Sequence, residues 1–166
     1  MIAHAVRPTL LAVAAALAMV AFSPAAGSAQ EAPPFWISNL EGRRFDSREH
    51  EGPIVLSFFF VNCPPCIKEI PQLHAIMARD FPDAALLFID PLGKEDTPQD
   101  IKAFAERLEV PLRYFYYDPL GRLAEKFYAD RFIFPTIVGI VDGRTAFRVH
   151  DLSEPSVETI RAALRQ

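Results

Sequence analysis

Hydrophobic residues along the chain fall into two kinds of run. Residues 54–61 and 84–90 are short and almost continuously apolar, which predicts two buried β-strands. Other stretches carry apolar residues at helical spacing, as over residues 101–108. That helix is expected to begin at Thr97-Pro98, because threonine is a good N-cap and proline suits the first helical position.

The same patterns predict the elements at the two ends of the chain. A short β-hairpin is expected over residues 35–46. Near the C-terminus, Asp142-Gly143 lies between two β-like runs, residues 136–141 and 145–150, and this dipeptide is a strong hairpin signal. The other expected elements are an aromatic strand over 112–117, a helix with Leu120, Leu123, Ala124 and Phe127, and a closing helix with Val157, Ile160 and Leu164.

Strands that alternate with helices and then end in a hairpin favour a layered α/β architecture. We predict one α/β domain over residues 30–166, with three layers (α/β/α) and a central mixed sheet. The N-terminal hairpin, in which Trp36 is expected to pack, is an addition before the core. No internal repeat, low-complexity tract or linker divides this part of the sequence.

Residues 1–29 have a pattern of their own. Arg7 precedes an apolar stretch over residues 10–22, and a run of small residues up to Ala29 follows. This order is typical of a secretory signal peptide, and the stretch is shorter than the roughly 20 apolar residues of a membrane-spanning helix. We therefore expect cleavage after Ala29 and export to the periplasm, where disulfides persist. An uncleaved membrane anchor is the alternative.

Composition excludes several classes of function. The chain has 17 basic and 21 acidic residues, a formal net charge of −4. This argues against a nucleic-acid partner, because proteins of that class present basic surfaces. Two cysteines are too few for the disulfide scaffold of a small secreted domain. His50, His74 and His150 do not have the spacing that would complete a zinc site with the cysteines.

The two cysteines form a C-x-x-C motif where a predicted strand leads into a predicted helix. Cys63 is expected at the helix N-terminus, where free backbone N–H groups and the helix dipole favour a thiolate. Cys66 shares a helical face with Ile70, Leu73 and Met77, and is expected to be the buried partner. The pattern predicts that Cys63 attacks a substrate disulfide and that Cys66 resolves the mixed disulfide. A static structural disulfide and a Cu(I) site on the two thiolates are the alternatives.

Around this motif the sequence resembles the thioredoxin fold, and within it the exported TlpA/ResA/CcmG-like thiol-disulfide oxidoreductases. The resemblance extends from about Pro34 to the C-terminus. Its most specific part is residues 63–73, which match the C-x-x-C-x-x-E-x-P-x-L pattern of that family. The segment Phe134-Pro135-Thr136 and the strand after it are similar to the family's cis-proline loop.

The resemblance implies a substrate groove around the cysteines, which would form the Cys63–Cys66 disulfide when oxidised. Pro135 is implied to follow a cis peptide bond and to shape this groove together with Phe134. Pro64 and Pro65, between the cysteines, are expected to contact the substrate as well. An ordinary trans proline at position 135 is the alternative.

Glu69 matches the active-site glutamate of the family. It follows Cys66 by three residues, so their side chains are neighbours on a helix. Two departures affect the site: Asn62 replaces the tryptophan usual before the first cysteine, and Ser57 stands where thioredoxin itself has a buried aspartate. Because serine is not a proton acceptor near neutral pH, we hypothesise that Glu69 takes this part in proton transfer. A solvated surface glutamate is the alternative.

The resemblance implies a reductase of a specific partner's disulfide. Its substrate would be a disulfide-containing protein of cytochrome c maturation or copper-site assembly. Its electrons would come from a membrane thiol transporter of the DsbD/CcdA kind. We expect a monomer, no cofactor and no nucleic-acid partner.

Three other functions compete with a reductase. A general oxidase of the DsbA kind carries a large helical insertion, and the stretch from Asp90 to Leu112 has room for one helix. A peroxiredoxin needs proline and threonine or serine at the positions that Leu56 and Phe60 occupy here. A Cu(I)-binding metallochaperone that uses Cys63 and Cys66 as metal ligands is the alternative that the sequence leaves open.

Overall fold

The computed structural model describes residues 30–93, 95–128 and 133–165 of the chain. The signal peptide predicted for residues 1–29 lies outside the described residues. Within them the elements are β1 (Trp36–Ser38), β2 (Arg44–Asp46), β3 (Ile54–Phe58), α1 (Pro64–Asp80), β4 (Ala85–Asp90), α2 (Pro98–Arg107), a 3₁₀-helix (Leu112–Tyr114), β5 (Phe115–Tyr117), α3 (Arg122–Phe127), β6 (Thr136–Val141), β7 (Arg144–Val149) and α4 (Glu154–Leu164).

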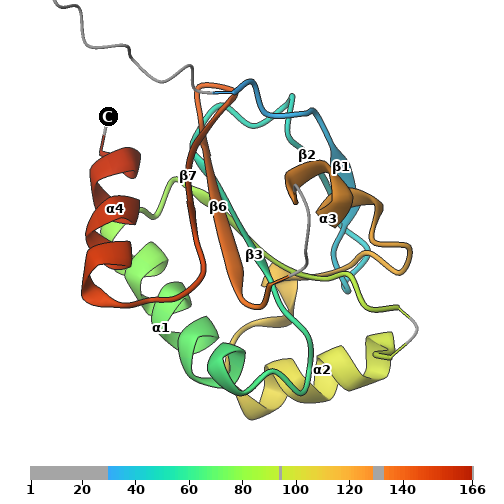
Figure 1. The fold of residues 1–166 in the computed structure, drawn as a ribbon. Helices are drawn as coiled ribbons and strands as arrows, with labels where there is room; N and C mark the ends of the chain where they lie inside the picture. The colour runs from blue at the N-terminus through green and yellow to red at the C-terminus, as the bar shows by residue number, and fades with distance from the viewer. Residues whose placement is uncertain (1–29, 94, 129–132, 166) are drawn as a thin grey trace, which may run out of the picture.

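The central sheet has five strands in the order β5-β4-β3-β6-β7 (Figure 1). β3, β4 and β5 are parallel, whereas β6 pairs antiparallel with β3, and β7 pairs antiparallel with β6. All five residues of β3 are buried, since this strand lies in the middle of a sheet covered on both faces. β1 and β2 form the separate N-terminal hairpin.

Two hydrophobic clusters cover the two faces of the sheet. On one face, α1, α2 and α4 contribute buried residues such as Ile70, Phe104 and Ile160. On the other, α3 and the hairpin contribute residues such as Phe127 and Phe35. Figure 1 shows α1 and α4 on one side of the sheet and α3 with β1 and β2 on the other. The predicted three-layer α/β/α fold with a mixed sheet and an added hairpin is therefore confirmed.

Two predicted strands are shorter in the structure than in the prediction. β3 ends at Phe58, so residues 59–61 belong to the connection that leads to α1. The predicted aromatic strand over 112–117 begins as a 3₁₀-helix after Pro111, and its last three residues pair with β4. A hydrophobic run does not show where a strand stops pairing, because loop residues can be buried too.

Two exposed hydrophobic side chains also correct the prediction. Trp36 is 63% exposed, because β1 directs Ile37 into the core and therefore directs its neighbours outward. The guanidinium of Arg44 lies 5.0 Å from the centre of the Trp36 ring. Leu120 precedes α3 instead of belonging to its apolar face, and it is 65% exposed.

Candidate active site

The helix α1 begins at Pro64, and Cys63 is its N-cap, as the motif predicts. The Sγ atom of Cys63 accepts a hydrogen bond from the backbone N–H of Cys66, with 3.3 Å between sulfur and nitrogen. Pro64 and Pro65 have no N–H, so Cys66 is the first residue of the helix with a backbone donor. No acidic side chain lies in the first turn to offset the positive end of the helix dipole.

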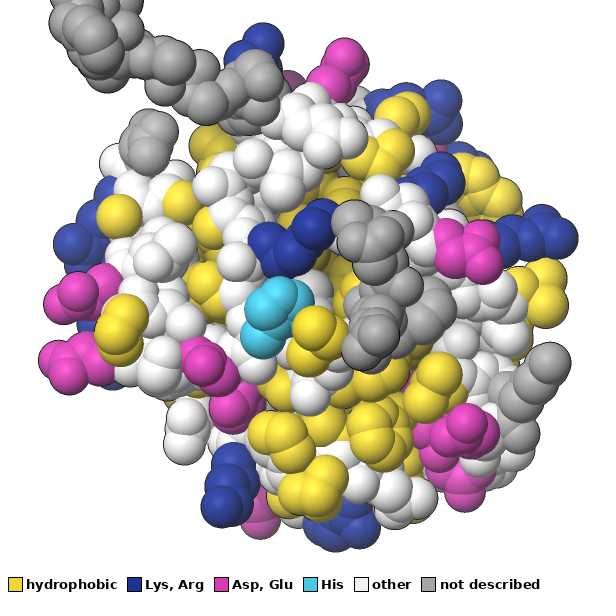
Figure 2. Space-filling view, viewed as in Figure 1, with side chains coloured by type: hydrophobic (Ala, Val, Ile, Leu, Met, Phe, Trp, Pro, Cys, Tyr) yellow, Lys and Arg dark blue, Asp and Glu magenta, His cyan; other side chains and the backbone are white. Residues whose placement is uncertain are grey.

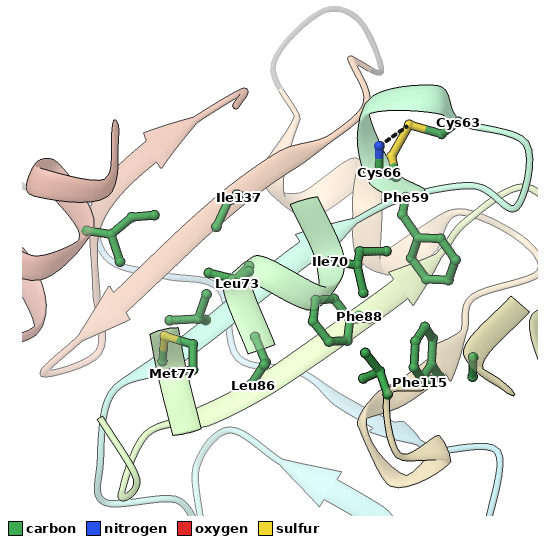
Figure 3. Close-up of a cluster of buried hydrophobic side chains, with 14 of the residues drawn as sticks. Phe59, Cys63, Cys66, Ile70, Leu73, Met77, Leu86, Phe88, Phe115 and Ile137 are labelled. Atoms are coloured by element: carbon green, nitrogen blue, oxygen red, sulfur yellow. Dashed lines mark hydrogen bonds between the residues drawn. A yellow bond between two sulfur atoms is a disulfide. The ribbon is translucent and has the colours of Figure 1, made fainter. Parts of the chain in front are cut away.

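A disulfide joins the Sγ atoms of Cys63 and Cys66, whose Cα atoms are 5.2 Å apart. Cys66, Ile70, Leu73 and Met77 form the buried face of α1, as their spacing predicts, and Figure 3 shows them along the core below the disulfide. Cys63 is 1% exposed and Cys66 is fully buried. Burial therefore does not distinguish the two sulfurs in the oxidised state, but position does: Cys63 precedes the helix and Cys66 lies in its first turn.

The connection between β3 and α1, residues 59–63, is called the cysteine loop below. The loop before β6 lies beside it. The Phe134–Pro135 peptide bond is cis, as the resemblance implies. The rings of Phe134 and Phe60 meet edge to face, with their centroids 5.3 Å apart. This contact places the residue before Pro135 against the segment that leads to Cys63.

Thr136 fastens the end of the same loop. Its hydroxyl donates a hydrogen bond to the carbonyl oxygen of Ile133, at 2.7 Å between the oxygens. The same hydroxyl oxygen lies 2.8 Å from Nδ1 of His150, at the end of β7. The loop is thus tied both to its own preceding residue and to the neighbouring strand.

The surface around the cysteines is apolar with a polar edge. Pro64 and Pro65 are exposed, and Ile67 and Ile133 are exposed by 38% and 49%. Figure 2 shows hydrophobic side chains gathered on the lower part of this face, where Figure 1 places the β3–α1 connection and the start of α1. Asn62 is exposed at the place of the family's usual tryptophan. Such a surface suits a polypeptide partner better than a small ionic molecule.

Glu69 is half-buried on α1, one turn after Cys66. Its Oε2 atom is buried and makes no hydrogen bond to the described residues. Burial raises the pKa of Glu69, and the negative charge of Asp151 raises it further, whereas a backbone hydrogen bond from Leu152 lowers it. The solvated surface position that we considered as the alternative does not fit a buried carboxylate oxygen.

Two buried acids close to the cysteine loop were not predicted from the sequence. Oδ2 of Asp96 accepts a hydrogen bond from the backbone N–H of Val61, at 3.0 Å, two residues before Cys63. Asp90 ends β4 and is fully buried. An acidic residue at the end of a buried apolar strand is visible in the sequence and could have been singled out.

No group of three or more His, Cys, Asp or Glu side chains among the described residues is placed to hold a metal ion. The described part of the chain also contains no helix of sufficient length and hydrophobicity to span a membrane.

Residues 28–140 match the AhpC/TSA family. A curated relative, sporulation thiol-disulfide oxidoreductase A of Bacillus subtilis (strain 168), is 26% identical over 120 residues, which cover 68% of this chain and 71% of that protein. The solved structure of StoA from Bacillus subtilis has a TM-score of 0.65 at 18% identity, covering 79% of this chain and 97% of that one.

A second solved structure is a secreted disulfide oxidoreductase of Mycobacterium tuberculosis, described as homologous to E. coli DsbE. It has a TM-score of 0.64 at 22% identity and covers 78% of this chain and 96% of that one. At such identities the two structures show the thioredoxin-like fold, whereas the family match extends over more than half of the chain. The chain belongs to the AhpC/TSA family and is a thioredoxin-like thiol-disulfide oxidoreductase.

Proposed function

We propose that this protein is a periplasmic reductase that donates two electrons to a disulfide of a specific partner protein. The observation that carries the proposal is the position of Cys63, whose sulfur caps α1 and is bonded to the sulfur of Cys66. The exposed apolar residues around this pair supply a surface for a polypeptide substrate.

The exchange takes two steps. In the reduced protein the Cys63 thiolate attacks one sulfur of the substrate disulfide, and the other substrate sulfur leaves as a thiolate. Cys66 then loses its proton, and its thiolate attacks Sγ of Cys63. The substrate leaves with two thiols, and the Cys63–Cys66 disulfide forms again. The substrate has gained two electrons, and this protein has lost them.

The cap of α1 supports the reducing direction. A strong oxidant owes its potential to a stabilised reduced form. Here Pro65 withholds the backbone donor of the second helical position from the Cys63 sulfur, so a thiolate at this cap is stabilised less than it would be with that donor. A less stable thiolate favours the disulfide form of this protein and therefore favours the donation of electrons. Moreover, the described residues between β4 and β5 form one α-helix, α2, and one short 3₁₀-helix, so the described fold has no large helical insertion there.

Glu69 and the cis-proline loop are proposed to support the exchange. Glu69 would accept the proton of Cys66, because its raised pKa brings it closer to that of a thiol. Glu69→Gln should slow the second step and remove an inflection from the pH–rate profile, whereas Glu158→Gln on the exposed side of α4 should do neither. The backbone beside Pro135, together with Phe134, Pro64 and Pro65, would hold the substrate strand.

Export and partners are part of the same proposal. We infer that residues 1–29 are removed as a signal peptide and that residues 30–166 act as a monomer in the periplasm. A membrane thiol donor of the DsbD/CcdA kind would reduce the pair again. N-terminal sequencing of the protein from a periplasmic fraction should begin at Gln30, and an intact Met1 in the membrane fraction would show an anchor instead.

The reduction potential of the Cys63–Cys66 pair tests the direction. We expect a value near or below about −220 mV after equilibration in dithiol buffers, towards the thioredoxin end of the scale. A value near about −120 mV would identify an oxidant and overturn the reductase. Stoichiometric binding of Cu(I) by reduced protein that shows no disulfide exchange would instead establish the metallochaperone.

A further inference from the structure

The buried carboxylate of Asp90 has one oxygen without a hydrogen-bond partner among the described residues. Its side chain is fully buried at the end of β4, and Oδ1 accepts the backbone N–H of Leu92 at 2.8 Å. Oδ2 is buried too and, as a carboxylate oxygen, finds no donor among the described residues. A buried acceptor without a donor is costly, whereas a carboxylic acid can itself donate.

Asp96 supplies the acceptor that a protonated Asp90 needs. Asp96 lies near enough for its side chain and its charge to act on the Asp90 carboxyl, and Asp96 is 5% exposed. Two carboxylates so close in a water-poor site cannot both stay ionised at low cost. One proton shared between them satisfies Oδ2 of Asp90 and leaves one negative charge on the pair.

The remaining charge has a definite partner in the cysteine loop. Oδ2 of Asp96 accepts the backbone N–H of Val61 at 3.0 Å. The backbone N–H of Phe59 still donates to the carbonyl oxygen of Ile89 in β4, and Val61 follows two residues later, just before Asn62 and Cys63. The bond to Asp96 therefore fixes the chain just before the nucleophile. The bond is charge-assisted and partly buried, and charge-assisted hydrogen bonds are among the stronger ones in proteins.

The groups that face the pair are acidic or phenolic. Glu95 lies close enough to act on Asp90 through its charge. The Tyr117 hydroxyl on β5 donates to the carbonyl oxygen of Asp96 at 3.0 Å. Asp118 donates its backbone N–H to the Asp90 carbonyl, while its carboxylate accepts three backbone N–H groups at the start of α3. Burial and the neighbouring Asp96 raise the pKa of Asp90 well above its usual range.

We propose that Asp90 and Asp96 share one proton, and that this shared proton positions Cys63 through the Asp96–Val61 hydrogen bond. Asp90 and Asp96 are thus positioning residues, and the cysteine loop is held most firmly while the proton is present. When the proton is lost at alkaline pH, the two carboxylates repel each other. Asp90 is fixed in the end of a strand, so Asp96 moves and releases Val61.

The first experiment uses the oxidised protein, in which the cysteines do not titrate. The amide proton shift of Val61 is followed by NMR across the neutral and alkaline range. We expect an inflection in the wild-type protein, its loss in Asp90→Asn, and its retention in Glu95→Gln. The asparagine amide of the Asp90→Asn variant keeps a donor towards Asp96 but carries no proton that titrates in this range. An inflection that persists in Asp90→Asn, or none in the wild type, would overturn the proposal.

Asp96→Asn tests the same idea if Asp90→Asn fails to fold. It removes the charge that raises the pKa of Asp90 while an amide oxygen can still accept the Val61 N–H. The inflection should then move to lower pH, and an unchanged midpoint would contradict a shared proton.

The second readout is the rate of disulfide exchange, and this part rests on the proposed function. After division by the thiolate fraction of Cys63 at each pH, the wild-type rate should fall through the same inflection that Val61 shows. The rate of Asp90→Asn should stay level there. An NMR inflection without a matching change in rate would support the shared proton but contradict its effect on Cys63. Absence of exchange at every pH would contradict the proposed function and not the carboxyl pair.

Discussion

α1 and α2 begin in the same way and serve different ends. Each has an N-cap residue followed by proline, and in each the cap side chain accepts the backbone N–H of the residue three positions on, at 3.3 Å. At α2 the cap is Thr97, and the carboxylate of Asp100 accepts a hydrogen bond from the backbone N–H of Thr97, which completes a capping box. At α1 the cap is a sulfur, and its first turn has no acid.

The difference shows how one local geometry serves either stability or chemistry. The capping box satisfies two backbone donors at the start of α2, and its carboxylate offsets the positive end of the helix dipole. At α1 no acid offsets the positive end of the helix dipole, so this end can stabilise the negative charge that forms on Cys63 during exchange. Substitutions at the two helix ends should therefore separate these roles.

The largest effect should come from replacing the sulfur at the α1 cap. Cys63→Ser keeps a good N-cap but removes the nucleophile, so disulfide exchange should fall to background while the fold survives. The reduction of insulin by the purified variant is the measurement. Cys66→Ser should instead accumulate mixed disulfides with the partner, and exchange at the wild-type rate by Cys63→Ser would contradict the assigned roles.

Pro65→Ala should convert the α1 cap towards an ordinary one. The variant adds a backbone donor at the second helical position, within reach of the cap sulfur. Because a hydrogen bond to a charged group is worth about 1.5 kcal/mol or more, the pKa of the Cys63 thiol should fall by about one unit and the protein should become less reducing. Thiolate absorbance against pH checks this.

Pro155→Ala is the matched control, since Pro155 lies in the first turn of α4 behind the cap Ser153. It should leave the Cys63 thiol unchanged. A rise in the thiol pKa of Pro65→Ala, or an equal change in both variants, would contradict the proposed effect of the missing donor.

Thr97→Ala should show how much the cap of α2 contributes to stability. Loss of the side-chain acceptor is expected to lower the free energy of unfolding by about 1 kcal/mol. The reduction potential should not change, because α2 does not hold the cysteines. Urea unfolding of the oxidised protein measures the free energy of unfolding. Thr97→Ser, which keeps a hydroxyl, should have a stability close to that of the wild type. A shift of the potential in Thr97→Ala would mean that the two helix ends are not independent.

The smallest effect concerns the acid in the capping box. Hydrogen bonds from the side chain and backbone of Thr97 lower the pKa of Asp100 below its usual 3.8. The stability that this carboxylate contributes is therefore present above pH 3.8 and is lost as the pH falls through the lower, folded value. Asp100→Asn should be slightly less stable than the wild type at neutral pH and equal to it in strong acid. A difference in stability between Asp100→Asn and the wild type that grows in acid would contradict the lowered pKa of Asp100.

Local signals in the sequence were enough for several parts of the fold. The buried face of α1, the Thr97 cap and the Asp142-Gly143 turn each depend on residues within a few positions of one another. Both turn residues have positive φ, 50° and 71°, as a two-residue hairpin requires. The cis bond before Pro135 agreed with a resemblance and not with any local rule.

Contacts between distant segments could not be predicted in this way. The Val61–Asp96 hydrogen bond joins residues 35 positions apart, and no periodicity relates them. The exposure of Trp36 depends on which face of a three-residue strand meets the core, and so short a strand gives little alternation to interpret. The 3₁₀ turn before β5 likewise depends on where that strand can first pair with β4.

The Thr136 hydroxyl, which fastens the cis-proline loop, also determines where a proton lies. A hydroxyl has one hydrogen, and that of Thr136 is given to the carbonyl of Ile133. His150 must therefore be the donor in its contact with Thr136, which assigns the neutral ring to the tautomer with hydrogen on Nδ1. The anchor of the cis-proline loop is therefore a relay of two hydrogen bonds, which runs from the ring of His150 through the Thr136 hydroxyl to the carbonyl oxygen of Ile133.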